Sequence, residues 1–562
     1  MSWRYRMTLL FFLLVFGLII CRLFYWQVVR AQELSAIGQA QYDRQVTTIA
    51  QRGEIKTSDG FAIAADKLAY LVYANPKLVK DKDEESDMLG KLLDIKSATI
   101  SALLSKDKFW VPLKANVDNS VKEKIEAKKI PGVGFQDETV RFYPEASMAA
   151  TLLGFVGKDE NGGNKGYFGL EGYYDRQLRG KDGTSIVVHD AAGQPILAKM
   201  NDSTMKVDGR SLLLHIDRRI QFMLDNELKN GIAKYGAQNG MAIVMDPKTG
   251  GVLAMSSFPS FDPRSYQNFD ESLYKNPLIS FAYEPGSTFK PLVMAAAMNE
   301  GLVKPDTQCD ICAGPVKIGE YDIKTWDDKY FPNTTMTDVI VHSDNTGMVY
   351  TGRELGMTKM LSYFDRFGIG DSTGIDLQGE VYPSLRPESE WYPIDQATAT
   401  FGQGLTVTPI GLITAFTAIA NGGQRMEPHV VAAVQTPDGQ TIPIPPKKLD
   451  QPISPQTAKV MTEIMVKAVN DGESSWTRIK GYRIAGKTGT AQIPVEGHYD
   501  PNKTIASFIG FAPADDPKFL MLVVLNRPST SIYGAETAAP IFFDAAKSIL
   551  NYYGIPADPS DE

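Results

Sequence analysis

The sequence predicts a mixed α/β protein of the α+β kind, built around an antiparallel sheet. Two pairs of strand-like segments indicate the sheet, 241–245 with 252–255 and 505–511 with 519–525. Each pair is joined by a short connection rich in proline and aspartate, which suits antiparallel strands rather than a doubly wound parallel sheet. Apolar residues at helical spacing from Arg218 to Tyr235 predict a long helix beside these strands.

Length and composition indicate several packed domains. The chain has 562 residues, more than one hydrophobic core usually serves, and 43% of them are hydrophobic. The formal net charge of -8 argues against a surface that holds a polyanion by charge alone. We therefore expect no nucleic acid among the partners.

The N-terminus carries an apolar segment at 7–28. Its length is about that of a membrane-spanning helix, which needs roughly 20 apolar residues. Bulky residues follow it instead of the small residues of a signal-peptide cleavage site, so we expect an uncleaved anchor. Arg4 and Arg6 precede it, which favours a cytoplasmic tail at 1–6. The predicted location is the cytoplasmic membrane, crossed once, with the rest of the chain outside the cytoplasm.

Two domains are predicted after the anchor. In the first, at 29–209, an alternating apolar segment near 61–73 indicates a strand, whereas 77–127 shows little periodicity. The polar run 199–209 is typical of a linker. From residue 211 the pattern changes, because strand and helix patterns become regular, and 210–562 is the second domain.

The first of three chemical motifs is Glu284-Pro-Gly-Ser-Thr-Phe-Lys290, which opens a helical stretch that closes at Gly301. Ser287 and Lys290 are three residues apart and therefore share a helix face. Serine is a weak nucleophile that needs an adjacent base, and a partly buried lysine serves as one. Taken alone, the motif is more often a simple helix N-cap at the serine, because serine is a preferred capping residue.

The second motif is Ser343-Asp344-Asn345, between amphipathic stretches at 335–341 and 346–355. A serine and an asparagine two residues apart in such a loop point into a cleft, where the hydroxyl relays a proton and the amide holds a substrate. These residue types also form ordinary turns.

The third motif is Lys487-Thr488-Gly489-Thr490. The lysine supplies positive charge, the threonine hydroxyls bind a carboxylate, and the glycine lets a ligand approach the backbone closely. Residues 481–488 also fit the spacing of a phosphate-binding loop. That loop should open a helix, and the sequence after it has no helical pattern, so a strand edge that binds a carboxylate is the better interpretation.

Other catalytic patterns have little support. The five histidines are not accompanied by a G-x-S-x-G motif, which argues against a Ser-His-Asp hydrolase. Cys309 and Cys312 could form half a zinc site, but a second ligand pair of suitable spacing is lacking, so a disulfide or two free thiols are favoured. We predict neither a metal nor a cofactor.

The order S-x-x-K, S-D-N, K-T-G is the signature of penicillin-binding proteins and serine β-lactamases. Over nearly its whole length the chain resembles a class B penicillin-binding protein, a monofunctional peptidoglycan D,D-transpeptidase. Further matching segments lie at 52–55, 59–60, 141–144, 169–171, 367–368, 373–380, 401–409 and 420–423. The first four resemble a non-catalytic pedestal domain that β-lactamases lack.

The resemblance implies the penicillin-binding-protein transpeptidase fold at 210–562, which is shared with serine β-lactamases. That fold has a five-stranded antiparallel sheet flanked by helices, an all-helical subdomain, and an active site between them. An elongated α+β pedestal at 29–209 and one N-terminal transmembrane helix precede it.

The resemblance also implies roles for the motif residues. Ser287 would attack the carbonyl of the penultimate D-alanine of a stem peptide, with Lys290 as base. Ser343 and Lys487 would assist proton transfer to the leaving D-alanine. The implied substrate-binding residues are Asn345, Thr488, Gly489 and Thr490, and the implied oxyanion hole consists of the backbone N–H groups of Ser287 and Thr490.

The implied partners are donor and acceptor stem peptides, with β-lactams as covalent inhibitors. A glycosyltransferase of the shape, elongation, division and sporulation (SEDS) family and other divisome or elongasome membrane proteins are implied as well. Glu284, 373–380 and 538–542 resemble the division type more than the elongation type, whereas Asp344 and Gln403 depart from it. A β-lactamase, a β-lactam sensor and a catalytically idle divisome scaffold are the alternatives.

Overall fold

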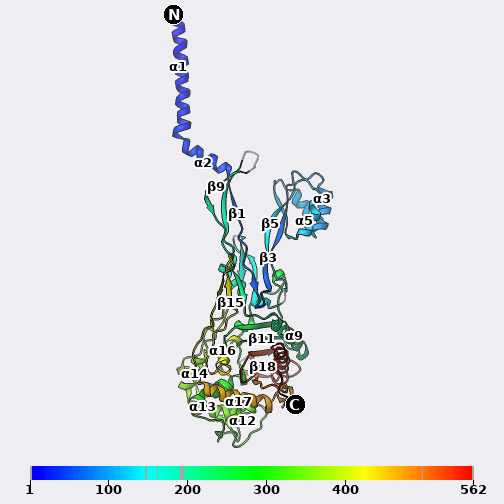
Figure 1. Cartoon of the computed structure of the whole chain (residues 1–562), viewed down its shortest axis with the longest axis vertical. Helices are drawn as coiled ribbons and strands as arrows, with labels where there is room; N and C mark the ends of the chain where they lie inside the picture. The colour runs from blue at the N-terminus through cyan, green and yellow to red at the C-terminus, as the bar shows by residue number, and fades with distance from the viewer. Residues whose placement is uncertain (1–2, 146–147, 161, 190–194, 496–497, 560–562) are drawn as a thin grey trace. The chain divides into compact units, whose positions relative to one another are not determined.

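The computed structural model describes residues 3–145, 148–160, 162–189, 195–495 and 498–559 (Figure 1). Contacts along the backbone divide the chain into two units. The first comprises Met1–Arg52 with Arg179–Gly209, and the second comprises Gly53–Leu178 with Arg210–Glu562.

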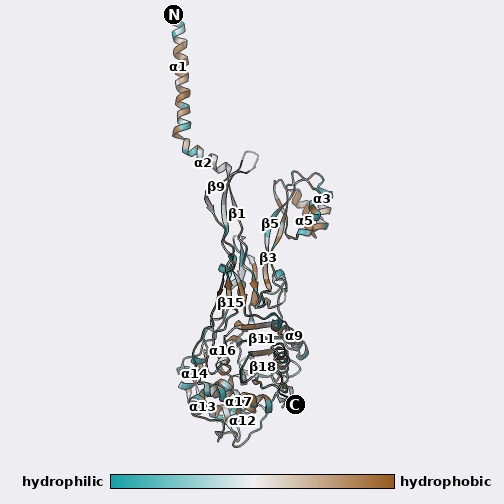
Figure 2. Ribbon diagram, in the orientation of Figure 1, coloured by the Kyte–Doolittle hydropathy of each residue, from teal (hydrophilic) through white to brown (hydrophobic). Residues whose placement is uncertain are grey.

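The first unit begins with an apolar helix. Helix α1 (Trp3–Phe24) runs into a π-helical turn (Tyr25–Val29), and together they are long and apolar enough to cross a membrane, with a mean hydropathy of 2.6. Figure 2 colours most of the length of α1 as hydrophobic. The Arg22 guanidinium lies 5.1 Å from the ring centre of Trp26, a pairing suited to a membrane–water interface. One N-terminal apolar helix thus fits a single-pass membrane anchor.

A small sheet completes this unit. Helix α2 (Ala31–Tyr42) leads into three antiparallel strands in the order β1 (Asp43–Thr48), β8 (Gly183–His189), β9 (Pro195–Thr204). The prediction of a linker at 199–209 is therefore wrong as far as Thr204. Backbone pairing with β8 makes this polar stretch a strand, and such pairing leaves no apolar pattern in the sequence.

The second unit contains a seven-stranded sheet, in which β2 and β10 are parallel neighbours. Its strands are β2 (Ile55–Lys56), β3 (Ala62–Ala74), β4 (Val111–Val117), β5 (Val133–Phe142), β10 (Ser211–Leu214), β15 (Val431–Gln435) and β16 (Thr441–Pro443). The strand predicted near 61–73 is β3. Strands β2 to β5 belong to the predicted first domain at 29–209, whereas β10, β15 and β16 belong to the predicted second domain at 210–562. This sheet therefore joins segments that the sequence analysis assigned to different domains.

The stretch 77–127, which shows little periodicity, is nevertheless regular. It holds α3 (Lys82–Leu93), α4 (Ser97–Leu104), β4 and α5 (Asn119–Glu126). The elements are too short to show a long apolar repeat, and α3 is delimited by polar residues instead. Asp81 caps its N-terminus through the N–H of Glu84, and Asp94 ends it in the left-handed conformation.

A five-stranded antiparallel sheet forms the centre of the C-terminal part, as predicted. Its order is β12 (Val252–Phe258), β11 (Asn239–Met245), β19 (Phe519–Asn526), β18 (His498–Ala512), β17 (Ala485–Val495). Both predicted strand pairs are present, and β17 is an edge strand. Helices α9 (Arg218–Tyr235) and α18 (Ala538–Tyr552) share one apolar cluster with this sheet, next to which α9 lies in Figure 1.

The remaining helices build the predicted helical subdomain and the other side of the core. They are α11 (Lys290–Asn299), α12 (Met336–Val341), α13 (Asn345–Leu355), α14 (Met357–Phe367), α15 (Pro393–Ala399), α16 (Pro409–Ala420) and α17 (Pro455–Asp471). Shorter elements are α6 (Ala150–Leu153), α7 (Gly169–Tyr173), α8 (Asp175–Arg179), α10 (Pro277–Ser280), β6 (Phe155–Lys158), β7 (Asn164–Tyr167), β13 (Val316–Ile318) and β14 (Tyr321–Ile323). Cys309 and Cys312 form a disulfide, which settles the alternatives left by their spacing.

Polar bonds join two of the recognised segments, 169–171 and 373–380. Gly169 forms a backbone bridge with Gln378, whose side-chain oxygen accepts from the N–H of Phe168 at 2.9 Å. The buried Asp376 carboxylate accepts from the Tyr174 hydroxyl at 2.9 Å and from the N–H groups of Val430 and Val431. These segments therefore have a structural reason to occur together.

A buried ion pair lies at the recognised segment 141–144. Arg141 Nε donates to Glu171 Oε1 at 2.6 Å, and the two side chains are 4% and 0% exposed. We expect Glu171→Gln to leave the buried guanidinium with Asp66, 3.1 Å from its Nη1 nitrogen, as a charged partner but without the charge of Glu171. The free energy of unfolding should fall by roughly 2 kcal/mol, as expected for the loss of a hydrogen bond to a charged group. Urea unfolding of the detergent-solubilised chain, followed by tryptophan fluorescence, measures this change.

The matched control is Asp118→Asn, in the exposed pair that Asp118 forms with Lys67 at 2.6 Å. Its effect should stay below about 1 kcal/mol. Equal unfolding midpoints for the two variants would contradict the importance of the buried pair.

Candidate active site

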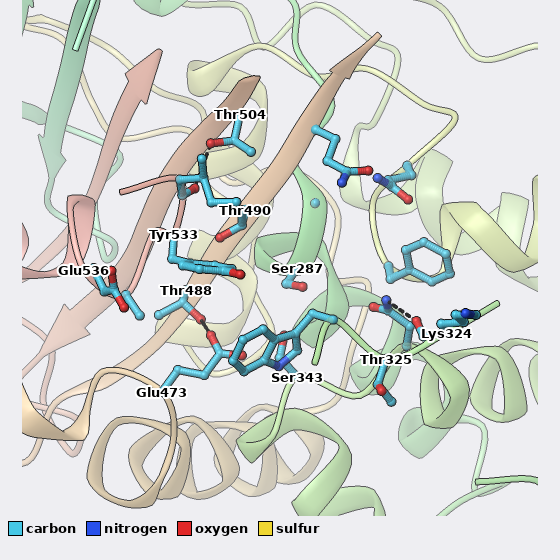
Figure 3. A pocket seen from close by; sticks show the side chains of 18 of the residues that line it. Ser287, Lys324, Thr325, Ser343, Glu473, Thr488, Thr490, Thr504, Tyr533 and Glu536 are labelled. Carbon is cyan, nitrogen blue, oxygen red and sulfur yellow. Dashed lines mark hydrogen bonds between the residues drawn. The ribbon is translucent and has the colours of Figure 1, made fainter. Parts of the chain in front are cut away.

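A cleft of 630 Å³ lies beside the edge strand β17, within the second unit (Figure 3). Five of the predicted site residues line it, namely Ser287, Ser343, Asn345, Thr488 and Thr490. In Figure 3 the Ser287 side chain lies between Ser343 on one side and Thr490 on the other. Lys290 and Lys487 are buried next to this cleft, and Gly489 belongs to β17. The structure therefore brings the three motifs to one place.

Ser287 lies in a 3₁₀ turn (Gly286–Phe289) that leads into α11. The caps of the two helices are Pro285 and Phe289, so the alternative interpretation of Ser287 as an N-cap is wrong. A close backbone approach holds the turn, because a Cβ atom on Gly402 would lie only 2.2 Å from the carbonyl oxygen of Gly286. This contact presents the half-buried Ser287 side chain to the cleft.

Lys290 is completely buried. Its ammonium donates to the Ser343 carbonyl at 2.6 Å, to Asn345 Oδ1 at 2.8 Å and to the Ser343 hydroxyl at 3.3 Å. Burial, helped by the nearby charge of Lys487, lowers the pKa of Lys290 to about 7. A substantial fraction of this side chain is therefore neutral near pH 7 and able to accept a proton.

A tight turn between α12 and α13 positions the second motif. Ser343 adopts a left-handed conformation with φ of 57°, and Asp344 follows as the N-cap of α13. Asp344 Oδ1 accepts from the N–H groups of Thr346 at 2.7 Å and Gly347 at 3.2 Å. The cap directs Asp344 away from its neighbours, which line the cleft.

The third motif lies on β17, where side chains alternate between the two faces. Lys487 Nζ donates to Thr488 Oγ1 at 3.0 Å, and Thr490 Oγ1 accepts from the Gly534 N–H at 3.0 Å. Burial lowers the pKa of Lys487, and the carboxylate of Glu473 opposes this shift. Both threonine hydroxyls face the cleft, as a site for a carboxylate requires.

Gly489 brings this strand close to the serine. A Cβ atom there would lie 2.4 Å from the Ser507 hydroxyl and 2.7 Å from the methyl group of Thr288. Because real side chains do not approach so closely, only glycine lets β17 lie against the turn that carries Ser287.

Several cleft residues were not predicted from the sequence. Glu473, which follows α17, accepts a hydrogen bond from Thr488 Oγ1 at 2.8 Å. The rings of Trp326 and Tyr533 meet edge-to-face, with centroids 5.5 Å apart, although they come from distant loops. These residues belong to no motif, and their loops give no periodic signal. Only the fold reveals them.

Comparisons with known proteins agree with this geometry. The model of the penicillin-binding protein transpeptidase domain matches residues 240–547, and that of the penicillin-binding protein dimerisation domain matches residues 47–214. Stage V sporulation protein D of Bacillus subtilis is 35% identical over 98% of this chain and 86% of its own. Peptidoglycan D,D-transpeptidase FtsI of Escherichia coli is 30% identical over 99% of this chain and 93% of its own.

Solved structures give the same result. The chain covers 98% of a peptidoglycan synthetase from Bifidobacterium adolescentis, with a TM-score of 0.73, 25% identity and 92% of this chain aligned. Penicillin-binding protein 3 of Mycobacterium tuberculosis, complexed with ampicillin, aligns over 92% of this chain and 98% of its own, with a TM-score of 0.71 and 25% identity.

The fold and the cleft define a serine transpeptidase of the class that shares its architecture with serine β-lactamases. Because the transpeptidase model covers more than half of the residues, the chain belongs to the penicillin-binding protein transpeptidase family. The dimerisation-domain match and the two relatives extend the likeness over nearly the full length.

The pKa of Lys290 makes the reactivity of Ser287 dependent on pH. A protonated lysine cannot accept the serine proton, so acylation by a fluorescent penicillin should be slow below a midpoint near pH 7 and reach a plateau above it. Lys487→Met removes a charge that lowers the Lys290 pKa, and the midpoint should therefore move to higher pH. Acylation rates measured across the pH range give both midpoints.

The control is Lys324→Met, which removes a cleft-lining lysine that does not perturb Lys290. Its midpoint should equal that of the unmodified chain. A rate that stays constant from about pH 5.5 to 9 would contradict a role for Lys290 as the base.

Proposed function

We propose that this protein is a peptidoglycan D,D-transpeptidase that cross-links stem peptides through an acyl intermediate on Ser287. The observation that carries the proposal is the fully buried Lys290, with a pKa of about 7, bonded to the serine-asparagine turn beside the cleft. A buried lysine whose pKa is near 7 can act as a base. A buried lysine without a chemical role would only cost stability, since an apolar residue in its place is often more stable.

The reaction begins with attack of Ser287 Oγ on the carbonyl carbon of the penultimate D-alanine. The hydroxyl proton passes to neutral Lys290, and the backbone N–H groups of Ser287 and Thr490 stabilise the oxyanion. Removing one such donor costs ~3 kcal/mol of transition-state stabilisation in comparable sites. When the tetrahedral intermediate collapses, the peptide C–N bond breaks and the terminal D-alanine leaves.

Ser343 and Lys487 deliver the proton that the departing amine needs. Ser343 Oγ lies 3.3 Å from Lys290 Nζ, so the proton taken from Ser287 has a short route to the leaving group. An amine of a neighbouring stem peptide then attacks the acyl-serine ester, forms the new amide bond and regenerates the Ser287 hydroxyl.

Substrate binding uses the remaining motif residues. Thr488 and Thr490 hold the terminal carboxylate, which the positive charge of Lys487 attracts, and Asn345 holds a backbone amide of the donor. Gly489 leaves the edge of β17 open to the peptide. β-Lactams resemble the D-alanyl-D-alanine end and acylate the same serine, and a relative crystallised with ampicillin supports this expectation.

The apolar helix at the N-terminus and the arginines before it support a membrane topology for the protein. We place 1–6 in the cytoplasm, 7–28 in the cytoplasmic membrane as its single pass, and a pedestal at 29–209 and the transpeptidase at 210–562 outside the cytoplasm. The proposed partners are a glycosyltransferase of the shape, elongation, division and sporulation family and other divisome or elongasome membrane proteins. We place the protein in septal wall synthesis, with FtsI of Escherichia coli among its relatives.

Intact mass spectrometry after incubation with penicillin tests the proposal. A long-lived adduct of one penicillin should form on the unmodified chain and be absent from Ser287→Ala, because that substitution removes the hydroxyl that forms the acyl ester. D-Alanine release should fall by roughly three orders of magnitude or more in this variant. Ser272→Ala, which changes an exposed serine outside the cleft, serves as the control.

The other outcomes identify other functions. Rapid turnover of the adduct would indicate a β-lactamase, and no adduct on any variant would contradict the proposal. Cells depleted of the native copy should not be rescued by Ser287→Ala, whereas a catalytically idle scaffold would rescue them.

A further inference from the structure

A second pocket of 220 Å³ adjoins the catalytic cleft, and we call it the side pocket. It lies between the loop 325–331, the end of α12 with the following turn, and Glu473. Three residues, Thr325, Trp326 and Glu473, line both the side pocket and the cleft. A ligand in the cleft therefore has a neighbouring space into which one of its groups extends.

Two buried oxygen atoms of side-pocket residues have no hydrogen-bond partner within the described part of the chain. One is Asp344 Oδ2, on a side chain whose other oxygen caps α13, and the other is Thr325 Oγ1. Asp344 is 4% exposed and Thr325 is 8% exposed. Because a buried acceptor without a donor is unfavourable, these atoms indicate a ligand that brings N–H groups.

The charge of the side pocket favours a cation. Its lining includes the carboxylates of Asp327, Asp344 and Glu473. The one lysine among the lining residues, Lys329, is paired with Asp327 at 3.2 Å. The other two carboxylates interact with the buried lysines Lys290 and Lys487, which are not among the lining residues, and the partial neutrality of Lys290 leaves the group with an excess of negative charge. The charge is therefore negative on the side that adjoins the cleft.

Aromatic rings complete the walls. Trp326 and Phe331 line the side pocket, and the Phe331 ring stacks on His342 with centroids 5.4 Å apart. The faces of aromatic rings attract organic cations. Among the described residues, no three His, Cys, Asp or Glu side chains are grouped to hold a metal ion. Acceptors, carboxylates and aromatic rings together suit an ammonium group, which has three N–H donors.

We propose that the side pocket binds the free ammonium group of the donor stem peptide. This inference rests on the proposed function, because cross-linking requires a free amine on the acceptor peptide. Donor and acceptor are the same kind of peptide, so the donor carries this amine too while its D-alanyl end occupies the cleft. Carboxylates keep the donor's amine protonated, and a protonated amine does not attack the acyl ester. The group anchors the donor and does not react.

Glu473 connects this binding to the catalytic cleft. Its Oε2 accepts from Thr488 Oγ1 at 2.8 Å, although Thr488 belongs to the pair expected to hold the substrate carboxylate. The negative charge of Glu473 repels that carboxylate. An ammonium group in the side pocket neutralises the repulsion, so a donor with a free amine is favoured over a donor whose amine is already cross-linked.

Two penicillins test the inference on the full chain. One carries an acyl side chain of lysine length that ends in a primary amine, and the other is its N-acetylated form. The amine form should acylate Ser287 roughly tenfold faster, as expected for a hydrogen-bonded charged group. In Asp344→Asn the preference should fall to within about twofold, while the retained amide oxygen still caps α13.

Thr325→Val provides a second variant, because it removes the other unpartnered oxygen without breaking a bond that the structure shows, and it should also reduce the preference. Asp322→Asn is the matched control, since Asp322 lines the cleft but not the side pocket, and it should keep the preference. Acylation rates come from competition with a fluorescent penicillin.

Equal acylation of the unmodified chain by both penicillins would overturn the inference and leave the proposed function intact. An undiminished preference in both Asp344→Asn and Thr325→Val would also overturn it. Acylation by neither penicillin would overturn the proposed function, and the inference with it.

Discussion

The catalytic region depends on the burial of one lysine ammonium group. Lys290 has no contact with solvent, and such a group is unfavourable in a protein interior unless it is hydrogen-bonded or neutral. Its partners are the carbonyl of Ser343 and the side-chain oxygen of Asn345. The left-handed turn at Ser343 supplies both oxygens. It directs the Ser343 carbonyl to Lys290, and it is followed directly by α13, whose first residue is Asn345. The requirements of Lys290 thus explain why the second motif must lie against the first.

The third motif joins them through backbone approach and charge balance. Gly489 permits β17 to lie against the turn that carries Ser287. Gly402 permits its own loop to lie against Gly286 of the same turn. The approach of β17 brings Lys487 near Lys290, where its charge lowers the cost of removing a proton from Lys290. Glu473 favours the charged form of both lysines. Burial and the charge of Lys487, opposed by the carboxylates of Asp344 and Glu473, together keep the pKa of Lys290 near neutral pH.

The sequence predicted the sheet, the helix Arg218–Tyr235 and the motif residues because each has a local signal. Each strand pair shows as two apolar segments joined by a short turn, and each motif has a fixed spacing of residues. The helices and the strand within 77–127 were missed because short elements show little periodicity, and β9 was missed because backbone pairing holds a polar strand. Glu473 and Tyr533 could not be predicted, since they reach the cleft from loops whose positions only the tertiary structure sets. The pairing of Cys309 with Cys312 likewise needed the structure.

A carboxylate beside a carboxylate-binding site needs a physical explanation. Glu473 holds the Thr488 hydroxyl in place and raises the pKa of Lys290, yet it repels the terminal carboxylate that Thr488 is expected to bind. A neutral residue would hold the hydroxyl without this repulsion. The position of Glu473 is favourable when the ligand places a positive charge in the side pocket. The Glu473 carboxylate then both holds the Thr488 hydroxyl and attracts the ligand. An unpaired oxygen of Asp344 beside it indicates where that charge is received.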